Sequence, residues 1–305
     1  MTTFADRLEP MRGELLRHCY RMTGSFTDAE DLVQDTMVRA WRAADSFDPG
    51  KASLRTWVFR IATNVCLTAL TGHARRTLPS GLLGQPSTDP QAPLLPDTQT
   101  LWLQPLPTDP ADIVAADEQI RLAFVTALQH LPPMQRAALL LRDVLGFSAA
   151  ECAGMLEVST ASVTSALQRA RRAMPAAPAA QPPDPEVVAA FVSAFQRADV
   201  AALVALLAED VELEMPPVPL WFRGREHYGE FMRRVFGMRG PDWRLVAASA
   251  NGQPALAAYV AAGTGDYQLH SLQVLEVAGH RIRRNVVFVD RQVFQAFGLP
   301  AGLER

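Results

Sequence analysis

Two neighbouring stretches of the chain carry side chains of opposite charge. Asp28, Asp31 and Asp35 recur along the first stretch, and Arg39 follows one turn later. The second stretch, from residue 49 to residue 88, contains no acid and has five basic residues: Lys51, Arg55, Arg60, Arg75 and Arg76. The first stretch is suited to a basic protein partner and the second to a polyanion.

Two helices are expected to position these charges. Thr27 followed by Glu30 reads as a capping box that starts the first helix. Its buried stripe is predicted to contain Val33, Met37, Ala40, Trp41 and Ala44. A polar turn, residues 45–50, ends this helix, and a second helix is expected from near Ser53 to Arg76. That helix should bury Leu54, Trp57, Val58, Ile61 and Val65.

A helix-turn-helix is predicted further along the chain. Ser148 and Glu151 form a second capping box, which opens a short helix containing Cys152 and Met155. A tight turn leads to a helix at about residues 159–174, with Val163, Leu167 and Ala170 inward. Its outer face is polar and then basic, which is typical of a recognition helix that lies against DNA.

Prolines mark two linkers, at residues 78–112 and 175–185. The first is expected to be extended, yet Leu101-Trp-Leu-Gln-Pro-Leu-Pro107 is too apolar for a plain spacer. Docking of Trp102 on the chain's own domains and its entry into a groove of a partner are equally supported. After the second linker, amphipathic helices precede alternating strands, which indicates an α+β domain.

The two charged stretches resemble a known family. Asp28-Ala-Glu-Asp-Leu-Val-Gln-Asp-Thr-Met-Val-Arg-Ala-Trp41 and Ser53-Leu-Arg-Thr-Trp-Val-Phe-Arg-Ile-Ala-Thr-Asn64 resemble the σ2 domain of extracytoplasmic-function (ECF) sigma factors. Leu131-Pro-Pro-Met-Gln-Arg-Ala and the stretch from Val158 to Arg172 resemble their σ4 domain. The match departs at Thr164 and Ala166, where many ECF factors carry Lys or Arg, so phosphate contact by the arginines is expected more than base readout.

The last third of the chain resembles the SnoaL-like, nuclear transport factor 2-like fold. Three stretches carry this likeness: residues 216–224, 250–255 and 297–300. With Trp102-Leu-Gln-Pro105, this tail places the resemblance nearest the mycobacterial sigma-G type. The expected fold is multi-domain, with two all-α sigma domains (a σ2 helical bundle and a σ4 helix-turn-helix) followed by an α+β domain. The expected parts are σ2 at 4–77, a linker at 78–112, σ4 at 113–174, a linker at 175–185 and a SnoaL-like regulatory domain at 186–305.

The resemblance implies a set of roles. Polymerase binding falls to Asp28, Asp31, Asp35 and Arg39. Contact with the −10 element and melting fall to Ser46, Phe47, Thr56, Arg60, Asn64, Arg75 and Arg76. Contact with the −35 element falls to Thr160, Ser162, Thr164, Ser165, Arg169 and Arg172. Trp57 is interpreted as core rather than as a wedge between bases, because it lies on the apolar stripe.

The tail leaves several functions open. Trp221, Phe222, Tyr228, His270 and Asp290 are candidates for a pocket. The related fold hosts cyclases and isomerases that use a buried Asp or His as base, and Asp266 and His280 are further candidates here. Fold alone does not give an activity, so a small-molecule sensor or an intramolecular contact is favoured over catalysis. No catalytic residue, metal or cofactor is predicted.

Composition sets limits on the remaining possibilities. The 305 residues have a net charge of −3, so contact with nucleic acid must come from local patches. No signal peptide or membrane span is predicted, and the three cysteines, Cys19, Cys66 and Cys152, are expected to be reduced and buried in a cytoplasmic protein. The predicted partners are core RNA polymerase and promoter DNA, with an anti-sigma protein left open. The alternatives are a helix-turn-helix regulator that acts without polymerase and an enzyme carried by the tail.

Overall fold

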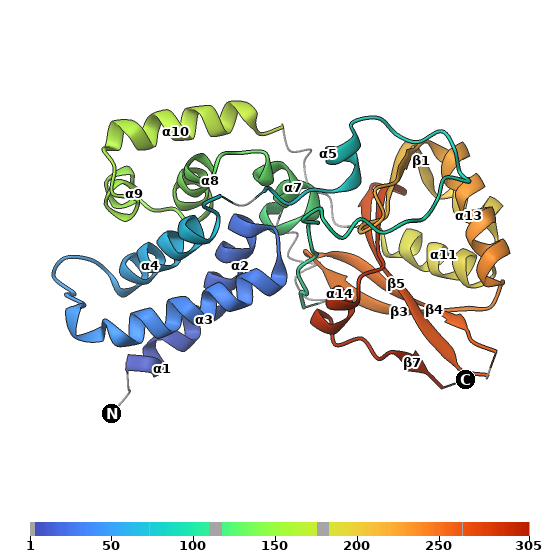
Figure 1. Ribbon diagram of the computed structural model, residues 1–305, viewed down its shortest axis with the longest axis horizontal. Coiled ribbons are helices and arrows are strands. Elements are labelled where there is room, and N and C mark those ends of the chain that lie inside the picture. Colours follow the sequence, from blue (N-terminus) through green and yellow to red (C-terminus); the bar gives the residue numbers. More distant parts are fainter. Residues whose placement is uncertain (1–3, 73, 110–117, 176–182, 264, 305) are drawn as a thin grey trace. The chain divides into compact units, whose positions relative to one another are not determined.

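The computed structural model describes residues 4–72, 74–109, 118–175, 183–263 and 265–304. The chain forms two compact units, each made of two separate segments. The first unit combines residues 1–76 with residues 122–177, and the second combines residues 77–121 with residues 178–305. The first unit is helical, and the second is built on a β-sheet (Figure 1).

The N-terminal part of the first unit is a small helical bundle. Its helices are α1 (Phe4–Leu8), α2 (Arg12–Thr23), α3 (Phe26–Arg42) and α4 (Leu54–Ala69), with short 3-10 turns at Glu9–Met11 and Ala44–Ser46. Helices α2, α3 and α4 pack against one another (Figure 1). Leu15, Cys19 and Met22 on α2 are fully buried, as their spacing predicts.

The ends of α3 and α4 differ from the expectation. The cap of α3 is Ser25, whose hydroxyl accepts from the Asp28 amide, so the prediction of Thr27 is wrong by two residues. Helix α4 begins as predicted near Ser53, whose hydroxyl caps it by accepting from the Thr56 amide. It ends at Ala69 rather than near Arg76. The hydroxyls of Thr68 and Thr71 donate to carbonyls four residues earlier, and such bonds slightly destabilise a helix.

The inward faces of α3 and α4 are also rotated from the predicted stripes. The buried residues of α3 are Ala29, Val33, Thr36 and Ala40, and those of α4 are Val58, Phe59, Ala62, Thr63, Val65 and Cys66. The buried face of α3 carries only small or β-branched side chains, whereas that of α4 includes the large, fully buried Phe59. Trp41 is 62% exposed, so its predicted burial is wrong. Trp57 is half-buried between Phe4 and Phe47.

The C-terminal part of the first unit holds the helix-turn-helix. Its helices are α7 (Leu122–Gln129), α8 (Pro133–Leu139), α9 (Ala149–Leu156) and α10 (Thr160–Ala173), with a π-helical turn at Leu140–Val144. The capping box of Ser148 and Glu151 is confirmed. Cys152 and Met155 on α9 and Val163 on α10 are buried as predicted. All three cysteines are free and buried, in agreement with their expected packing role.

The second unit is an α+β domain. Its strands are β1 (Leu207–Glu214), β2 (Trp221–Arg223), β3 (Trp243–Ala250), β4 (Gln253–Ala261), β5 (Tyr267–Ala278), β6 (Arg281–Phe288) and β7 (Gly302–Leu303). They form one sheet in the order β2-β1-β6-β5-β4-β3, with β7 paired to β5. All pairs are antiparallel except β1 with β6.

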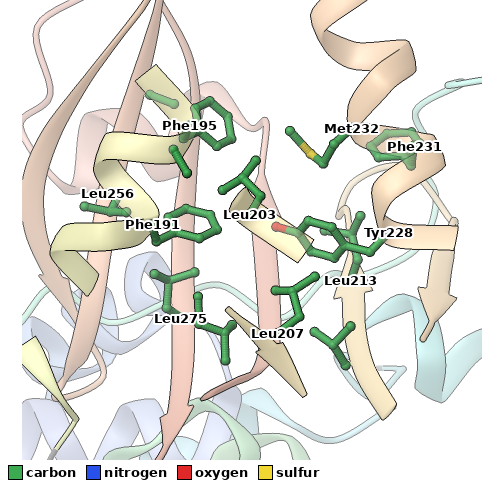
Figure 2. Close-up of a cluster of buried hydrophobic side chains, with 14 of the residues drawn as sticks. Phe191, Phe195, Leu203, Leu207, Leu213, Tyr228, Phe231, Met232, Leu256 and Leu275 are labelled. Atoms are coloured by element: carbon green, nitrogen blue, oxygen red, sulfur yellow. The ribbon is translucent and has the colours of Figure 1, made fainter. Parts of the chain in front are cut away.

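Helices cover this sheet and close its core. They are α11 (Pro185–Gln196), α12 (Val200–Ala205), α13 (Arg225–Arg239) and α14 (Arg291–Ala296). Figure 2 shows Phe191 and Phe195 of α11 facing Leu256 and Leu275 of the strands, with Tyr228 of α13 completing the cluster. The helix–strand order predicted from the change of periodicity is confirmed.

The proline-rich segment after residue 77 packs with the second unit. It contains a short helix, α5 (Pro79–Leu83), so the expectation of a wholly extended segment is wrong. Trp102 is largely buried, and its Nε1 donates to the Asp97 carbonyl at 2.8 Å. Leu103 and Leu106 are buried too. Of the two possibilities left open for Trp102, the structure shows docking within its own chain.

Asn251, in the β3–β4 turn, forms hydrogen bonds to the end of this segment. Its Oδ1 accepts from the Leu106 amide at 2.9 Å, and its Nδ2 donates to the Ile120 carbonyl at 2.6 Å. Asn251 itself has a φ of 57°, which Asn tolerates better than most residues and which the tight turn requires. One turn residue therefore holds both ends of residues 106–120.

Candidate polymerase and nucleic-acid interfaces

Helix α3 presents an acidic and partly apolar outer face. Asp31 is exposed, Asp35 pairs with Arg39 at 2.9 Å, and Asp28 pairs with Arg76 at 2.7 Å. The exposed positions Asp31, Gln34, Val38 and Trp41 follow one another at three- and four-residue steps, so they form one stripe. An exposed Trp beside acids on a rigid helix is typical of a protein interface.

Thr56, Arg60 and Asn64 recur every four residues along α4 and therefore share one face. Arg60 is exposed and Asn64 is half-buried. Thr56 is hydrogen-bonded at both sides: Ser53 Oγ lies 2.8 Å from its Oγ1, which donates to Glu151 Oε1 at 3.0 Å. The structure thus brings the three predicted residues together, with one of them held by the helix-turn-helix.

The turn before α4 is stiffened by aromatic contacts. The Phe47 ring lies 5.4 Å from that of Trp57 and 6.3 Å from that of Phe4, measured between centroids. The guanidinium of Arg7 lies 5.8 Å from the same ring. Ser46 donates its hydroxyl proton to the Ala43 carbonyl at 2.7 Å. Phe47 is therefore positioned by a small aromatic group, and Ser46 remains exposed beside it.

The two arginines after α4 have different surroundings. Arg75 is exposed, and its guanidinium lies 3.1 Å from Nδ1 of His130. Burial, with Arg75 and Arg136 as lesser causes, lowers the pKa of His130. Arg76 is largely covered and tied to Asp28. Arg75 is the more accessible of the pair for a phosphate.

The outer face of α10 is open to solvent. All six residues predicted to face the −35 element are exposed: Thr160, Ser162, Thr164, Ser165, Arg169 and Arg172. Ser159 caps the helix, and its hydroxyl accepts from the Ser162 amide. Arg171, on the same helix, instead pairs with Asp143 of the preceding turn at 2.7 Å.

Arg55 joins α4 to the helix-turn-helix. Its guanidinium pairs with Glu14 at 2.5 Å, donates to the Leu145 carbonyl at 3.2 Å, and lies 4.5 Å from the centre of the Phe147 ring. Phe147 in turn lies 5.6 Å from Phe59. The sequence places Arg55 only in a general basic patch, because its partners Glu14 and Leu145 lie 41 and 90 residues away in the chain.

Arg136 makes a second connection within the first unit, and it does so while buried. It donates to the carbonyls of Met22, Gln129 and Leu131 and to the side chain of Gln129 at 2.7 Å. Burial, in the absence of a strong opposing charge, lowers its pKa to about 10. It is the Arg of the Leu131-Pro-Pro-Met-Gln-Arg136 stretch, so the motif contained the residue although its partners could not be predicted.

The second unit contains a cavity of about 370 Å³ between α13, the sheet and the proline-rich segment. Of the five residues predicted for a pocket, His270 lines this cavity and the others do not. Trp221, Phe222 and Tyr228 are buried in the packed core, and Asp290 caps α14 by accepting from the Gln292 amide at 2.8 Å. The sequence shows which residues are aromatic, but it does not show which of them face a cavity.

A buried polar network lies in the same domain. Asn285 Nδ2 donates to Tyr228 Oη and to Gln273 Oε1, both at 2.9 Å. Burial raises the pKa of Tyr228 to about 12. Gln273 also lines the cavity, so this network connects the cavity wall to the core. Asp266, His280 and Asp290 do not line the cavity, so the described residues contain no Asp–His pair within it.

Two further properties follow from the described residues alone. No group of three or more His, Cys, Asp or Glu side chains in them is arranged to hold a metal ion. None of the described helices is long and apolar enough to cross a bilayer.

Comparison with known protein families agrees with this arrangement. The Sigma-70 region 2 family matches residues 8–76, the Sigma-70 region 4 family matches residues 121–174, and the SnoaL-like domain family matches residues 188–285. Two helical sigma modules followed by an α+β domain define a class of RNA polymerase sigma factors with a C-terminal extension.

Individual relatives narrow this class. The ECF RNA polymerase sigma factor SigG of Mycobacterium tuberculosis H37Rv is 47% identical over 98% of this chain and 85% of its own length. SigJ of the same strain is 33% identical over 68% of this chain and 62% of its own length. The chain therefore belongs to the ECF sigma factor family, and its function is in transcription initiation.

A solved structure supports the fold of the whole chain. The crystal structure of SigJ from M. tuberculosis matches with a TM-score of 0.68 at 24% sequence identity. The match covers 96% of this chain and 99% of SigJ. The expected order of domains, two sigma domains followed by a SnoaL-like domain, is confirmed.

Proposed function

We propose that this sigma factor binds core RNA polymerase through the outer face of α3 and opens promoter DNA with α4 and the turn before it. The polymerase-binding residues are Asp28, Asp31, Asp35 and Arg39, joined by Trp41. The acids set orientation and association rate against a basic surface, because exposed charge pairs add little affinity by themselves. Trp41 supplies the apolar contact area that the acids lack.

The observation that carries this proposal is the 62% exposure of Trp41 on a well-packed helix. Because Trp41 is 62% exposed and lies outside the packed core, Trp41→Ala should leave the fold intact. We expect it to weaken binding to core polymerase at least ~10-fold, the loss typical of an interface Trp. Val246→Ala, which removes an exposed apolar side chain from β3, is the matched control. Equal affinities of the two variants would contradict the assignment.

Strand opening is assigned to one side of α4 and the adjoining turn. Phe47 stacks on a flipped base, and Thr56 and Asn64 hydrogen-bond to its edge, with Ser46 beside them. Arg60, Arg75 and Arg76 contact phosphate. The exposed Arg60 and the aromatic support of Phe47 favour this arrangement. Asn64→Ala and Phe47→Ala should reduce open-complex formation more than polymerase binding, and an equal loss of both would argue against these roles.

Contact with the −35 element is assigned to Thr160, Ser162, Thr164, Ser165, Arg169 and Arg172 on α10. The −10 and −35 elements are about 25 base pairs, or roughly 85 Å, apart in B-form DNA. Helix α9 contacts α4 in this structure, so α4 and α10 cannot occupy both elements at once without separating. The first unit therefore represents a closed state that must open on promoter DNA.

The second unit is proposed to regulate this opening and not to act as an enzyme. The segment that joins the two sigma modules, residues 77–121, is part of this unit and is held there by Asn251 and by a buried Trp102. Fully extended, the segment could span roughly 150 Å, but not while it is docked. A small-molecule ligand in the cavity or the intramolecular contact itself would set the docked fraction. Deleting residues 186–305 should change promoter-dependent transcription, and unchanged transcription would contradict a regulatory role.

A further inference from the structure

The cavity of the second unit has walls suited to an apolar body. Most of its lining is aliphatic or methionine, including Met215, Met232 and Met238. Methionine side chains are flexible and polarizable, so they can adjust to ligands of different outline. Its volume of about 370 Å³ is within the range of small-ligand sites, near the lower end.

One part of the lining is polar and carries a positive charge. His270 and Arg239 both line the cavity, and no Asp or Glu is among the lining residues. The Nδ1 atom of His270 is buried and has no hydrogen-bond partner within the described residues. Burial, with Arg239 as a smaller cause, lowers the pKa of His270 to about 4, so the ring is neutral at neutral pH. Trp243 fixes the ring from another side, with the centroids 5.1 Å apart.

Another wall comes from the segment that joins the two sigma modules. Leu94 and Pro96 of that segment line the cavity. The segment is attached on both sides of them: Ser87 donates its amide to the Trp221 carbonyl at 2.8 Å, and Asp97 donates its amide to the Pro217 carbonyl at 2.9 Å. Between these points Arg234 donates to the Pro90 and Ala92 carbonyls at 2.8 and 2.7 Å.

We propose that the cavity binds an amphipathic organic monoanion whose apolar body contacts α13 and the sheet, with its acidic head group at Arg239 and His270. Because Leu94 and Pro96 form part of the wall, the bound anion also holds residues 87–97 on the second unit. This inference rests on the proposed regulatory role and names the ligand class for it.

The charge distribution favours an anion over a neutral or cationic ligand. A cation would meet Arg239 without any acid in the lining to offset it, and a fully apolar ligand would leave His270 Nδ1 unpaired. A carboxylate can accept from the Arg239 guanidinium and from an imidazole N–H. A ligand shifts the docking equilibrium of the segment only if it binds the docked state more tightly. The anion should do so because the cavity lacks one wall when the segment is undocked.

Binding is tested on the full chain by calorimetry with decanoate below its critical micelle concentration, with 1-naphthoate, and with the neutral analogue 1-decanol below its solubility limit. At least one of the two anions should bind with a dissociation constant at least ~10-fold lower than that of decanol. Arg239→Gln should remove that difference, and Arg233→Gln, an exposed position on the same helix, should preserve it. Two anions that bind no better than decanol would overturn the proposed ligand class.

A cavity-filling variant tests the location. Val289→Trp places a large side chain at a half-exposed cavity residue, and Val246→Trp does the same at a comparable position on β3 outside the cavity. Only the first should weaken binding of the anion, by at least ~10-fold. Equal affinities of the two variants would place the ligand elsewhere.

The coupling is tested by hydrogen exchange of residues 87–97. At a ligand concentration ~100 times the dissociation constant, the undocked population should fall by up to ~100-fold, and the amides of Ser87 and Asp97 should exchange more slowly by that factor. Binding without slower exchange would overturn the coupling while leaving the site intact. None of these assays contains polymerase, so their failure is distinguishable from a failure of sigma activity, which transcription measures directly.

Discussion

Thr56 donates its hydroxyl proton to Glu151 at 3.0 Å and so joins α4, assigned to strand opening, to the first helix of the helix-turn-helix. Glu151 also completes the capping box of α9. Bonds to Ser148, more than the one to Thr56, lower the pKa of the Glu151 carboxyl. Within the first unit these two residues join α4 to α9, and in the closed state proposed above this bond would keep Thr56 from contacting DNA.

Removing the contacts of Arg55 with the helix-turn-helix should open the first unit. Arg55→Gln removes the donor to the Leu145 carbonyl and the cation–π contact with Phe147, so the modules should separate more often. Spin labels at Lys51→Cys and Gln168→Cys report the distance, because the three native cysteines are buried and will not react. We expect a longer and broader distance distribution than in the parent chain.

The matched control is Arg171→Gln, which breaks an exposed ion pair with Asp143 inside the helix-turn-helix. It should leave the distance distribution unchanged. Identical distributions for Arg55→Gln and the parent would contradict the assignment of Arg55 as a connecting residue.

Arg136 should be essential for the stability of the first unit. Arg136→Met leaves the Met22, Gln129 and Leu131 carbonyls without this donor, and each unpaired buried acceptor costs about 1–3 kcal/mol. We expect the free energy of unfolding to fall by about 3 kcal/mol or more, measured by urea denaturation followed by circular dichroism. Arg136→Lys should recover only part of this, because an ammonium cannot reach all the carbonyls. A loss no larger than that of the exposed Arg172→Met would show that the buried arginine is dispensable.

His18 should make the protein sensitive to acid. Burial lowers its pKa from 6.5 to about 3, and its Nε2 lies 3.0 Å from Thr63 Oγ1. Below pH 6.5 the unfolded state therefore binds a proton that the folded state does not, so stability is lost as the pH falls toward 3. The loss is about 2 kcal/mol between pH 6.5 and pH 5.

His18→Gln removes this titration and keeps a hydrogen-bonding group for Thr63. Its free energy of unfolding should depend less steeply on pH than that of the parent, by about one proton between pH 6 and pH 4. Urea denaturation at a series of pH values measures the slope. Parallel curves for the two proteins would contradict a neutral, buried His18.

Glu214 and Arg284 should stabilise the second unit only as a pair. Glu214 is fully buried, accepts from Arg284 Nε at 2.8 Å, and receives the Ser80 amide at 2.9 Å. Arg284→Met strands a buried carboxylate and should cost about 3–5 kcal/mol, which lowers the melting temperature measured by calorimetry. The double variant with Glu214→Gln should recover more than half of this loss. A double variant that melts lower than Arg284→Met would contradict a compensating pair.

The sequence was most informative where structure is local. The start of α4 near Ser53, the capping box of Ser148 and Glu151 and the change from helical to alternating periodicity all depend on residues within a few positions of one another. The outer face of α10 was likewise predictable, because a short amphipathic helix has one clear apolar stripe.

Features that depend on distant contacts were not predictable. Spacing alone predicted that both Trp41 and Trp57 lie on buried stripes, yet Trp41 is 62% exposed. Docking of the segment around Trp102 depends partly on Asn251, which binds the Leu106 amide from more than 100 residues later in the chain. Asp290 was predicted as a pocket residue, but its carboxylate accepts a backbone amide and caps α14.

The most direct test is transcription in vitro from fragmented genomic DNA with purified core RNA polymerase, followed by mapping of transcript 5′ ends. Genomic fragments include every promoter of the source organism, so no single promoter has to be chosen. We expect a set of discrete start sites that appear only when the protein is added and that weaken with Trp41→Ala and Phe47→Ala. A map identical to that of core polymerase alone would contradict a role of this chain in promoter recognition.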